Sequence, residues 1–210
     1  MVDLLRLGER NQPDLPLSPA PVEGHTGTYT DMAMVSAPRL RPAARAVVLD
    51  AGARVLLVHF VFGTVEHLPN GLWACPGGGI EPPETLADGL RRELREELGL
   101  DIVEVGPPIW RKEHVFPMGS GWDGQRDTFF LVEVDTFDPC PTLSAAELLA
   151  ENLNAWRWWT IAELQAAQTA YDAAPQDPSV LTFSPRRLGD LITDLLANGR
   201  PRELLQLDPV

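Results

Sequence analysis

Three glutamates within one turn of a predicted helix are the residues of this 210-residue sequence best suited to chemistry. Glu93, Glu96 and Glu97 follow a run of three glycines at residues 77–79. Carboxylates at i and i+4 on a helix repel each other by about 0.2–0.5 kcal/mol per pair, unless water or a cation offsets the repulsion. Mg²⁺ prefers carboxylate oxygens, keeps several waters and bridges to substrate phosphates. The glutamates therefore indicate either a solvated helix face or a Mg²⁺ site, with Mn²⁺ as a substitute.

The helix that must position these glutamates spans residues 82–100. Its apolar stripe consists of Leu86, Leu90, Leu94 and Leu98, and Gly99 follows where a left-handed C-terminal cap is expected. At 100° per residue, Glu97 lies about 40° and Glu96 about −60° from Glu93, beside leucines at about 60° to 140°. We therefore expect the acidic stripe to run along the edge of the apolar stripe, neither buried nor opposite the core. Such an edge suits a cleft.

The glycines and the acidic helix form one spaced motif. Gly78 is followed after five residues by Glu84, and after seven more by the segment RELREELGL at residues 92–100. This spacing resembles the Nudix box, from Gly78 to Leu100, at every specified position. Pro83 is a small departure, because Nudix sequences often have glycine before the first glutamate of the box. A looser resemblance to the Nudix domain extends over residues 41–168.

The resemblance implies an α/β fold, the Nudix-type α/β/α sandwich with a mixed β-sheet. It also implies Mg²⁺-dependent hydrolysis of a pyrophosphate linkage in a nucleoside diphosphate derivative. The expected substrate is an ADP-ribose-like dinucleotide, slightly ahead of a (deoxy)nucleoside triphosphate. Members specific for ADP-ribose tend to carry a proline at a set distance beyond the box, and Pro117, seventeen residues beyond Leu100, lies near that distance without matching it.

The resemblance also assigns roles within the box. Glu93, Glu96 and Glu97 are implied metal ligands, and any one of them could also be the general base. The carbonyl of Gly77 is a further implied ligand. The remaining box residues, Glu84 and Arg92, look like groups that hold the glutamates in place.

Residues outside the box supply further candidates. Many Nudix enzymes place an extra catalytic glutamate in the region of Glu147 and Glu151, and we assign that role to Glu151; the alternative is a short exposed helix with Glu147 as its cap. The candidates for substrate binding are Arg111, Trp122 and Arg126, with Lys112 beside them, and ordinary surface or core positions are the alternative. Trp156 and Trp158 are expected in the core.

Two other functions compete with hydrolysis. A Nudix-like domain can bind a nucleotide as a sensor without cleaving it, although regulators of that kind usually carry an added DNA-binding module. An isomerase of diphosphate lipids shares the box but needs a catalytic cysteine in the cleft, for which Cys75 is the candidate. An intact box favours catalysis over both alternatives.

The amino-acid composition limits the classes of molecule that this protein is expected to bind. The formal net charge of −13 argues against nucleic acid and against an anionic membrane surface. An anionic small substrate, here a nucleotide, needs a local cation to receive it. The two cysteines form no C-x-x-C pair and fit a reducing compartment, and the N-terminus has no apolar run typical of a signal peptide. We expect a cytoplasmic protein and consider a homodimer.

The chain is expected to have three parts. Residues 1–38 form a proline-rich arm, flexible or packed on a partner; residues 39–168 form the Nudix domain; residues 169–210 add one helix packed on that domain. Within the domain, the glycines at 77–79 are expected in a loop. Strands are expected at residues 44–50, 54–62, 101–105, 109–116, 125–135 and 155–160, and helices at 82–100, 144–153, 160–164 and 184–197.

Overall fold

The computed structural model describes residues 37–63, 68, 70–116 and 121–208. The chain divides into two units, residues 1–36 and 37–210, and the second unit contains all of the described residues. Most of the predicted N-terminal arm and Pro117 lie outside the described residues.

A nine-stranded mixed sheet forms the centre of the described unit. Its main path runs β8-β3-β2-β1-β6-β5-β9, with β4 paired to β1 and β7 paired to β2. The pairs β1–β6, β3–β8 and β5–β9 are parallel and the others antiparallel. The strands are β1 (Leu40–Asp50), β2 (Val55–Phe60), β3 (Leu72–Ala74), β4 (Gly77–Gly79), β5 (Pro108–Val115), β6 (Gly124–Val134), β7 (Leu153–Trp159), β8 (Phe183–Ser184) and β9 (Leu205–Leu207).

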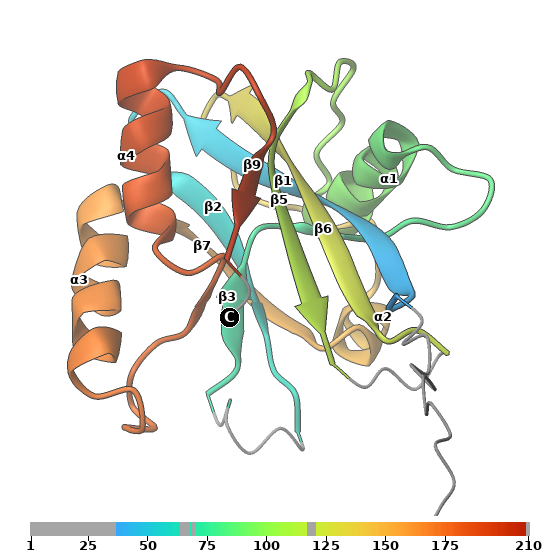
Figure 1. Ribbon diagram of the computed structural model, residues 1–210. Helices are drawn as coiled ribbons and strands as arrows, with labels where there is room; N and C mark the ends of the chain where they lie inside the picture. Colours follow the sequence, from blue (N-terminus) through green and yellow to red (C-terminus); the bar gives the residue numbers. More distant parts are fainter. Residues whose placement is uncertain (1–36, 64–67, 69, 117–120, 209–210) are drawn as a thin grey trace, which may run out of the picture. The chain divides into compact units, whose positions relative to one another are not determined.

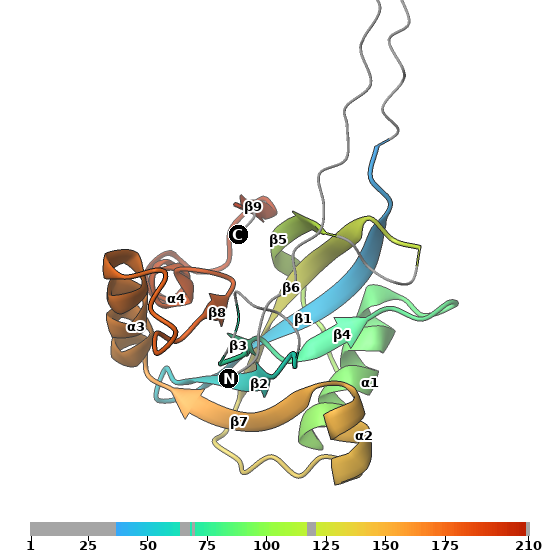
Figure 2. The same cartoon turned by 90° about the horizontal axis from the view of Figure 1, so that it is seen from below.

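Helices cover both faces of this sheet (Figures 1 and 2). They are α1 (Leu86–Leu98), α2 (Ala145–Ala150), α3 (Ile161–Ala173) and α4 (Leu188–Asn198). In Figure 2, α1 and α2 lie on one side of the strands, and α3 and α4 lie on the other. The predicted α/β/α sandwich with a mixed sheet is therefore confirmed. Among the described residues, no helix is both long and apolar enough to cross a bilayer.

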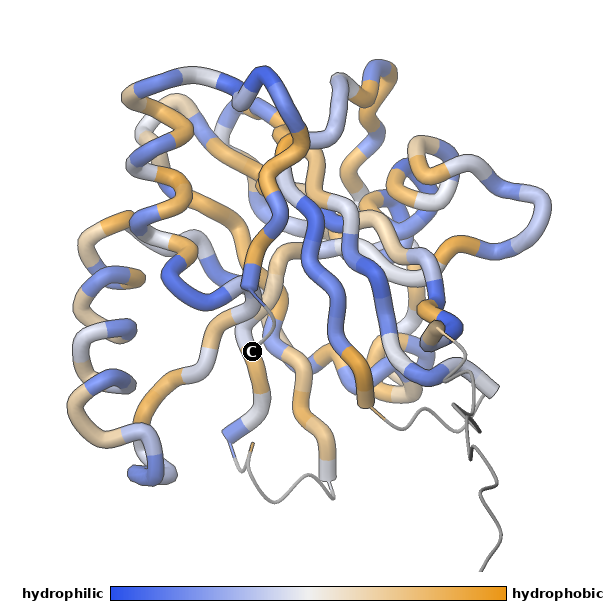
Figure 3. The backbone as a smooth tube through the Cα atoms, viewed as in Figure 1, coloured by the Kyte–Doolittle hydropathy of each residue, from blue (hydrophilic) through white to orange (hydrophobic). Residues whose placement is uncertain are grey.

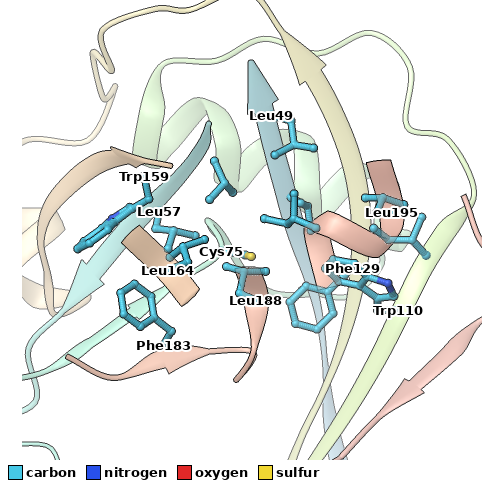
Figure 4. Packing of buried hydrophobic residues seen from close by; sticks show 14 of the residues in the cluster. Leu49, Leu57, Cys75, Trp110, Phe129, Trp159, Leu164, Phe183, Leu188 and Leu195 are labelled. Atoms are coloured by element: carbon cyan, nitrogen blue, oxygen red, sulfur yellow. The ribbon is translucent and has the colours of Figure 1, made fainter. Parts of the chain in front are cut away.

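The two layers of helices create two hydrophobic cores, because alternate residues of a strand point to opposite faces. Val47 and Leu49 of β1 pack with α3 and α4, in the cluster drawn in Figure 4. Ala46 and Val48 pack on the other face, against the leucines of α1. The predicted apolar stripe of α1 is thus the part of the helix that docks on the sheet. Polar and apolar residues are interleaved along α3 and α4 in Figure 3; α4 buries Leu188, Ile192 and Leu195 on one side, whereas α3 buries only Leu164.

Several local predictions were wrong. Residues 101–105 form no strand, and the backbone carbonyl of Val103 instead accepts a hydrogen bond from Arg91. The side chains of Ile102 and Val105 still pack against the core, so an apolar pattern there reflects burial without strand pairing. Helix α4 begins at Leu188 rather than Ser184, since Ser184 pairs in β8.

The prediction that Trp156 and Trp158 lie in the core was wrong for Trp156, whereas Trp158 packs against the core on the α1 face. Trp156 is exposed, while Trp158 is half-buried and donates a hydrogen bond to the carbonyl of Phe137. Trp159 is the buried member, packed edge-on against Trp73 and Phe183. Because both faces of the sheet are covered, alternation alone does not say which tryptophans are most deeply buried.

The last part of the chain belongs to the same sheet. Strand β8 pairs with β3, and β9 pairs with β5. Helix α4 packs beside α3 in the core shown in Figure 4. The segment between α3 and β8 also lines the cavity that contains the acidic edge of α1. Removing everything after residue 168 would therefore remove β8, α4 and β9. Strands β3 and β5 would lose these partners, and the core covered by α4 would be exposed.

Candidate active site

Three glutamates from two separate segments converge at one place. Glu93 and Glu97 come from α1, and Glu151 caps the C-terminal end of α2. Each offers one carboxylate oxygen, and these three oxygens lie within 4.8 Å of one another. Carboxylate oxygens at such spacing match the donors that hard divalent cations prefer. The cluster could therefore hold a metal ion.

The acidic edge of α1 is buried, contrary to the expectation from the helical wheel. Glu93 and Glu97 are only 7% and 2% exposed. The reason is β4, which the sequence indicated as a loop but which forms a strand paired with residues 43–45 of β1. This strand contacts the acidic edge, so that the backbone N–H of Gly77 donates to Oε2 of Glu97 at 2.8 Å.

Gly77 and Gly78 of β4 lie so close to neighbouring atoms that a side chain at either position would collide with them. A Cβ on Gly78 would lie 2.5 Å from Oε1 of Glu93, and one on Gly77 would lie 2.3 Å from the carbonyl oxygen of Ala44. Gly77 also has φ +120°, a conformation that other residues rarely adopt. Glycine thus lets the strand fit between β1 and the carboxylates.

Arg92 connects Glu93 of this cluster to neighbouring residues of the box. Its guanidinium contacts Glu84 at 2.7 Å, Glu93 at 2.9 Å and Glu96 at 3.0 Å. It also donates to the carbonyl of Gly79 at 3.0 Å. The hydrogen bond from Arg92 is the main reason that the pKa of Glu84 lies below its usual value. The structure thus brings Glu84 and Arg92 to the positions where they can orient the cluster, and it directs Glu96 toward Arg92.

Arg45 is a cation of the site that the sequence motifs did not indicate. It donates hydrogen bonds to the carbonyl of Gly77 and to Oδ1 of Asp127, the latter at 3.3 Å. The carbonyl predicted as a metal ligand therefore already accepts a hydrogen bond from this guanidinium. Arg45 interrupts an apolar strand at "ARAVVLD", whereas Asp127 follows two polar residues in "QRDTFF". A charged residue within an otherwise buried strand was the signal that could have identified Arg45; no such signal in the sequence indicated Asp127.

The burial of the cluster changes how its carboxylates titrate. Burial raises the pKa of Glu97 to about 8, and the nearby charge of Arg45 counteracts this only in part. Burial likewise raises the pKa of Glu93 and of Glu151. By contrast, a hydrogen bond from His114 and the charge of Arg45 outweigh burial at Asp127 and lower its pKa to about 2. A bound cation would favour the charged form of all three glutamates.

The other predicted site residues lie elsewhere. Glu147 accepts hydrogen bonds from the backbone and hydroxyl of Ser144, so it caps α2. Arg126 pairs with Glu113 at the surface, and the guanidinium of Arg39 lies over the ring of Trp122. Neither Arg126, Trp122 nor Arg111 lines the cavity beside the glutamates.

That cavity has a volume of about 1700 Å³. One part of its wall is formed by Glu93, Glu97 and Glu151. Another part is formed by cationic and aromatic groups from β1, β2, β5, α3 and the segment after β8. These include Arg45, Phe60, Lys112, Tyr171 and Arg186. A metal site and a cationic wall in one cavity match the needs of a phosphorylated substrate.

A model of the NUDIX domain family matches residues 39–181, which include the sheet core, the glutamate cluster and much of the cavity wall. The chain belongs to the Nudix family. The family assignment made from the box is therefore confirmed.

Among curated relatives, the chain is 31% identical over 88 residues to nucleoside triphosphatase NudI of Klebsiella pneumoniae. It is 33% identical over 90 residues to the Escherichia coli protein of the same name. In both comparisons the match covers 42% of this chain and 61% of the relative. The chain thus spans about three fifths of the length of these relatives.

Solved structures support the fold. The MutT protein from Methanosarcina mazei superposes with a TM-score of 0.51 at 16% identity, over 78% of this chain and 98% of that one. A NUDIX hydrolase from Nitrosomonas europaea gives a TM-score of 0.50 at 22% identity, over 80% and 97% of the two chains. Both likenesses concern the α/β architecture.

Proposed function

We propose that this protein is a divalent-metal-dependent hydrolase that cleaves a pyrophosphate linkage in a nucleoside diphosphate derivative. The observation that carries the proposal is the convergence of Glu93, Glu97 and Glu151, whose oxygens lie within 4.8 Å of one another. Two of these carboxylates are buried, and burial raises the pKa of both despite the charges of Arg92 and Arg45, so a further cation would stabilise their charged forms. Family membership and the nucleoside triphosphatase relatives support the same reaction class.

The three glutamates are the proposed metal ligands, and Mg²⁺ or Mn²⁺ fits their oxygen donors. A divalent cation held there would neutralise pyrophosphate oxygens and acidify a bound water. Arg92 keeps Glu93 oriented, and the N–H of Gly77 keeps Glu97 oriented. Glu96, which contacts Arg92, is proposed to tune the charge of the cluster.

Glu151 is proposed as the group that accepts a proton from water. It is the exposed member of the cluster and makes no side-chain hydrogen bond with any described residue. Burial and the charge of Glu96 raise its pKa in the metal-free protein, and a cation bound to the cluster would lower it again.

The isomerase alternative fits the structure poorly. Cys75 is fully buried in the core of Figure 4, and burial raises the pKa of its thiol to about 12. Thiolate is the reactive form of cysteine, so this thiol is unsuited to catalysis at neutral pH. A nucleotide sensor that does not cleave its ligand stays as the competing function.

A substrate panel tests the proposal directly. Purified protein is incubated with nucleoside triphosphates and with ADP-ribose, and products are identified by mass. We expect hydrolysis in Mg²⁺ or Mn²⁺ and none in excess chelator, with recovery when metal is restored. Tight binding of a nucleotide without turnover, under every metal condition, would instead establish the sensor. Full turnover in chelator would remove the glutamate cluster from the mechanism.

A further inference from the structure

Three cations in the cavity wall, Arg41, Lys112 and Arg186, form no ion pair with a described residue, and the charge of Arg186 acts on Lys112. Arg45, in the same wall, is neutralised by Asp127 at 3.3 Å. In a chain with a net charge of −13, cations without an ion-pair partner in the same cavity as an acidic cluster are unexpected.

Lys112 is the most unusual of the three, because it is 0% exposed. Its ammonium donates one hydrogen bond, to Oγ of Ser184 at 3.1 Å, although an ammonium has three donors. Lysine is almost never fully buried unless it is paired. Burial lowers its pKa to about 8, and the neighbouring charges are Asp127, which raises the pKa, and Arg186 and Arg45, which lower it.

Arg186 lines the same cavity, and its charge acts on Lys112. Its guanidinium carbon lies 3.9 Å from the centre of the Tyr171 ring, and it donates a hydrogen bond to the hydroxyl of the same residue. Its Nε is shielded from solvent and has no hydrogen-bond partner. A stacked, planar guanidinium on a half-buried residue that lines the cavity is well suited to phosphate oxygens.

The cavity wall therefore has an anionic part and a cationic part, and a series of neighbouring groups connects them. Glu97 contacts Gly77, Gly77 contacts Arg45, and Arg45 contacts Asp127. The charge of Asp127 raises the pKa of Lys112. The ammonium of Lys112 donates a hydrogen bond to Ser184, which lies two residues before Arg186 in the sequence. One part is anionic and suits a metal; the other is cationic and suits an anion that carries no metal.

We propose that Arg186, Lys112 and Ser184 form a subsite for a phosphate group outside the linkage that is hydrolysed. This inference rests on the proposed function and narrows its substrate class. A nucleoside triphosphate has a third phosphate to place there, whereas in ADP-ribose both phosphates belong to the one linkage between two riboses. The preference for an ADP-ribose-like dinucleotide, drawn from the position of Pro117, is therefore reversed.

The test uses Lys112→Met, which keeps the apolar stem, and Arg186→Gln. The matched control is Arg187→Gln, because the side chain of Arg187 is 72% exposed, pairs with Asp190 and does not line the cavity. Kinetics with Mg²⁺ are measured on ATP and on ADP-ribose. We expect kcat/KM for ATP to fall about tenfold or more in both cavity variants, mainly through KM, with little change for ADP-ribose.

A binding measurement separates this inference from the proposed function. Calorimetry with inorganic triphosphate, without metal, should give about tenfold weaker binding for Lys112→Met and Arg186→Gln than for the wild type and Arg187→Gln. Weakened binding with no hydrolysis of any nucleotide would support the subsite and refute the hydrolase. Equal affinities for all four proteins, or equal losses on ATP and ADP-ribose, would overturn the subsite whether or not hydrolysis occurs.

Melting temperatures distinguish binding from a structural role. If Lys112 serves only the fold, Lys112→Met should melt lower than the wild type; if it serves a ligand, the variant should melt no lower, because a buried charge is removed. If Lys112→Met does not fold, Lys112 has a structural role. The kinetics of Arg186→Gln and its affinity for inorganic triphosphate then decide whether the subsite exists.

Discussion

The backbone N–H of Gly77 and the carboxylate of Glu97, twenty residues apart in sequence, are joined by a 2.8 Å hydrogen bond. This bond attaches β4 to the acidic edge of α1 and lies within the buried part of the cluster. It explains why the glycine run and the glutamates of the box occur together. The glycines allow a backbone N–H to reach a carboxylate that a side chain would otherwise displace.

Gly77→Ala should therefore damage both the fold and the site. The new Cβ would meet the carbonyl of Ala44 at 2.3 Å, at a φ of +120°. We expect a loss of about 1–3 kcal/mol or more in unfolding free energy, together with most of the activity. Denaturant unfolding and kcat measure both effects. The control is Gly63→Ala, whose added Cβ meets no described atom within 4 Å; equal behaviour of the two variants would show that close approach at Gly77 is unimportant.

Glu97→Gln should abolish most of the activity without destabilising the metal-free protein. The amide keeps the shape but removes one charge from the proposed ligand set. We expect a loss in kcat of about a hundredfold or more, equivalent to about 2.7 kcal/mol. The metal-free melting temperature should be equal or higher, since a buried carboxylate with a pKa raised to about 8 is lost. Addition of Mg²⁺ should raise the melting temperature of the wild type more than that of the variant.

Glu84→Gln is the matched comparison within the same box. Glu84 contacts Arg92 at 2.7 Å but is not among the three clustered glutamates. This change should therefore reduce stability more than Glu97→Gln does and reduce kcat less. The reverse order, with near-normal kcat in Glu97→Gln and none in Glu84→Gln, would mean that the metal lies elsewhere.

The stability of Lys112→Met relative to the wild type should depend on pH. Burial lowers the pKa of Lys112 to about 8 from its usual 10.5, so the folded state binds fewer protons than the unfolded state between these values. Wild-type stability therefore gains as pH rises from about 8 to 10.5, and the buried charge is most costly below that window. Any advantage of Lys112→Met at pH 7 should shrink across the window. A constant difference in unfolding free energy from about pH 7 to 10.5 would show that folding does not lower the pKa of Lys112.

Deleting residues 1–36 should leave hydrolysis per active site largely unchanged. The described cavity is built from residues beyond this boundary, and Arg39 with its contact to Asp123 is retained. The deletion can still change the oligomeric state, which light scattering measures. A folded but inactive truncated protein would mean that the N-terminal segment completes the site.

The sequence alone determined the family, the sandwich and the acidic turn of α1. The acidic turn and the family follow from local patterns, since the leucine stripe, the left-handed cap at Gly99 and the spacing from Gly78 to Leu100 are all encoded within 23 residues, and the sandwich is what the resemblance to the family implies. Such short-range signals are legible because helix periodicity and glycine conformation depend on neighbours in the chain.

Only the tertiary structure decided which residues share the cavity. Glu151 joins Glu93 and Glu97 because α2 ends beside α1, whereas Glu147, one turn earlier, is used as a cap. Strand pairing places Arg45 beside Asp127, and Lys112 contacts Ser184 across 72 residues of chain. Contacts between distant segments depend on the packing of the whole sheet, which no local pattern in the sequence records.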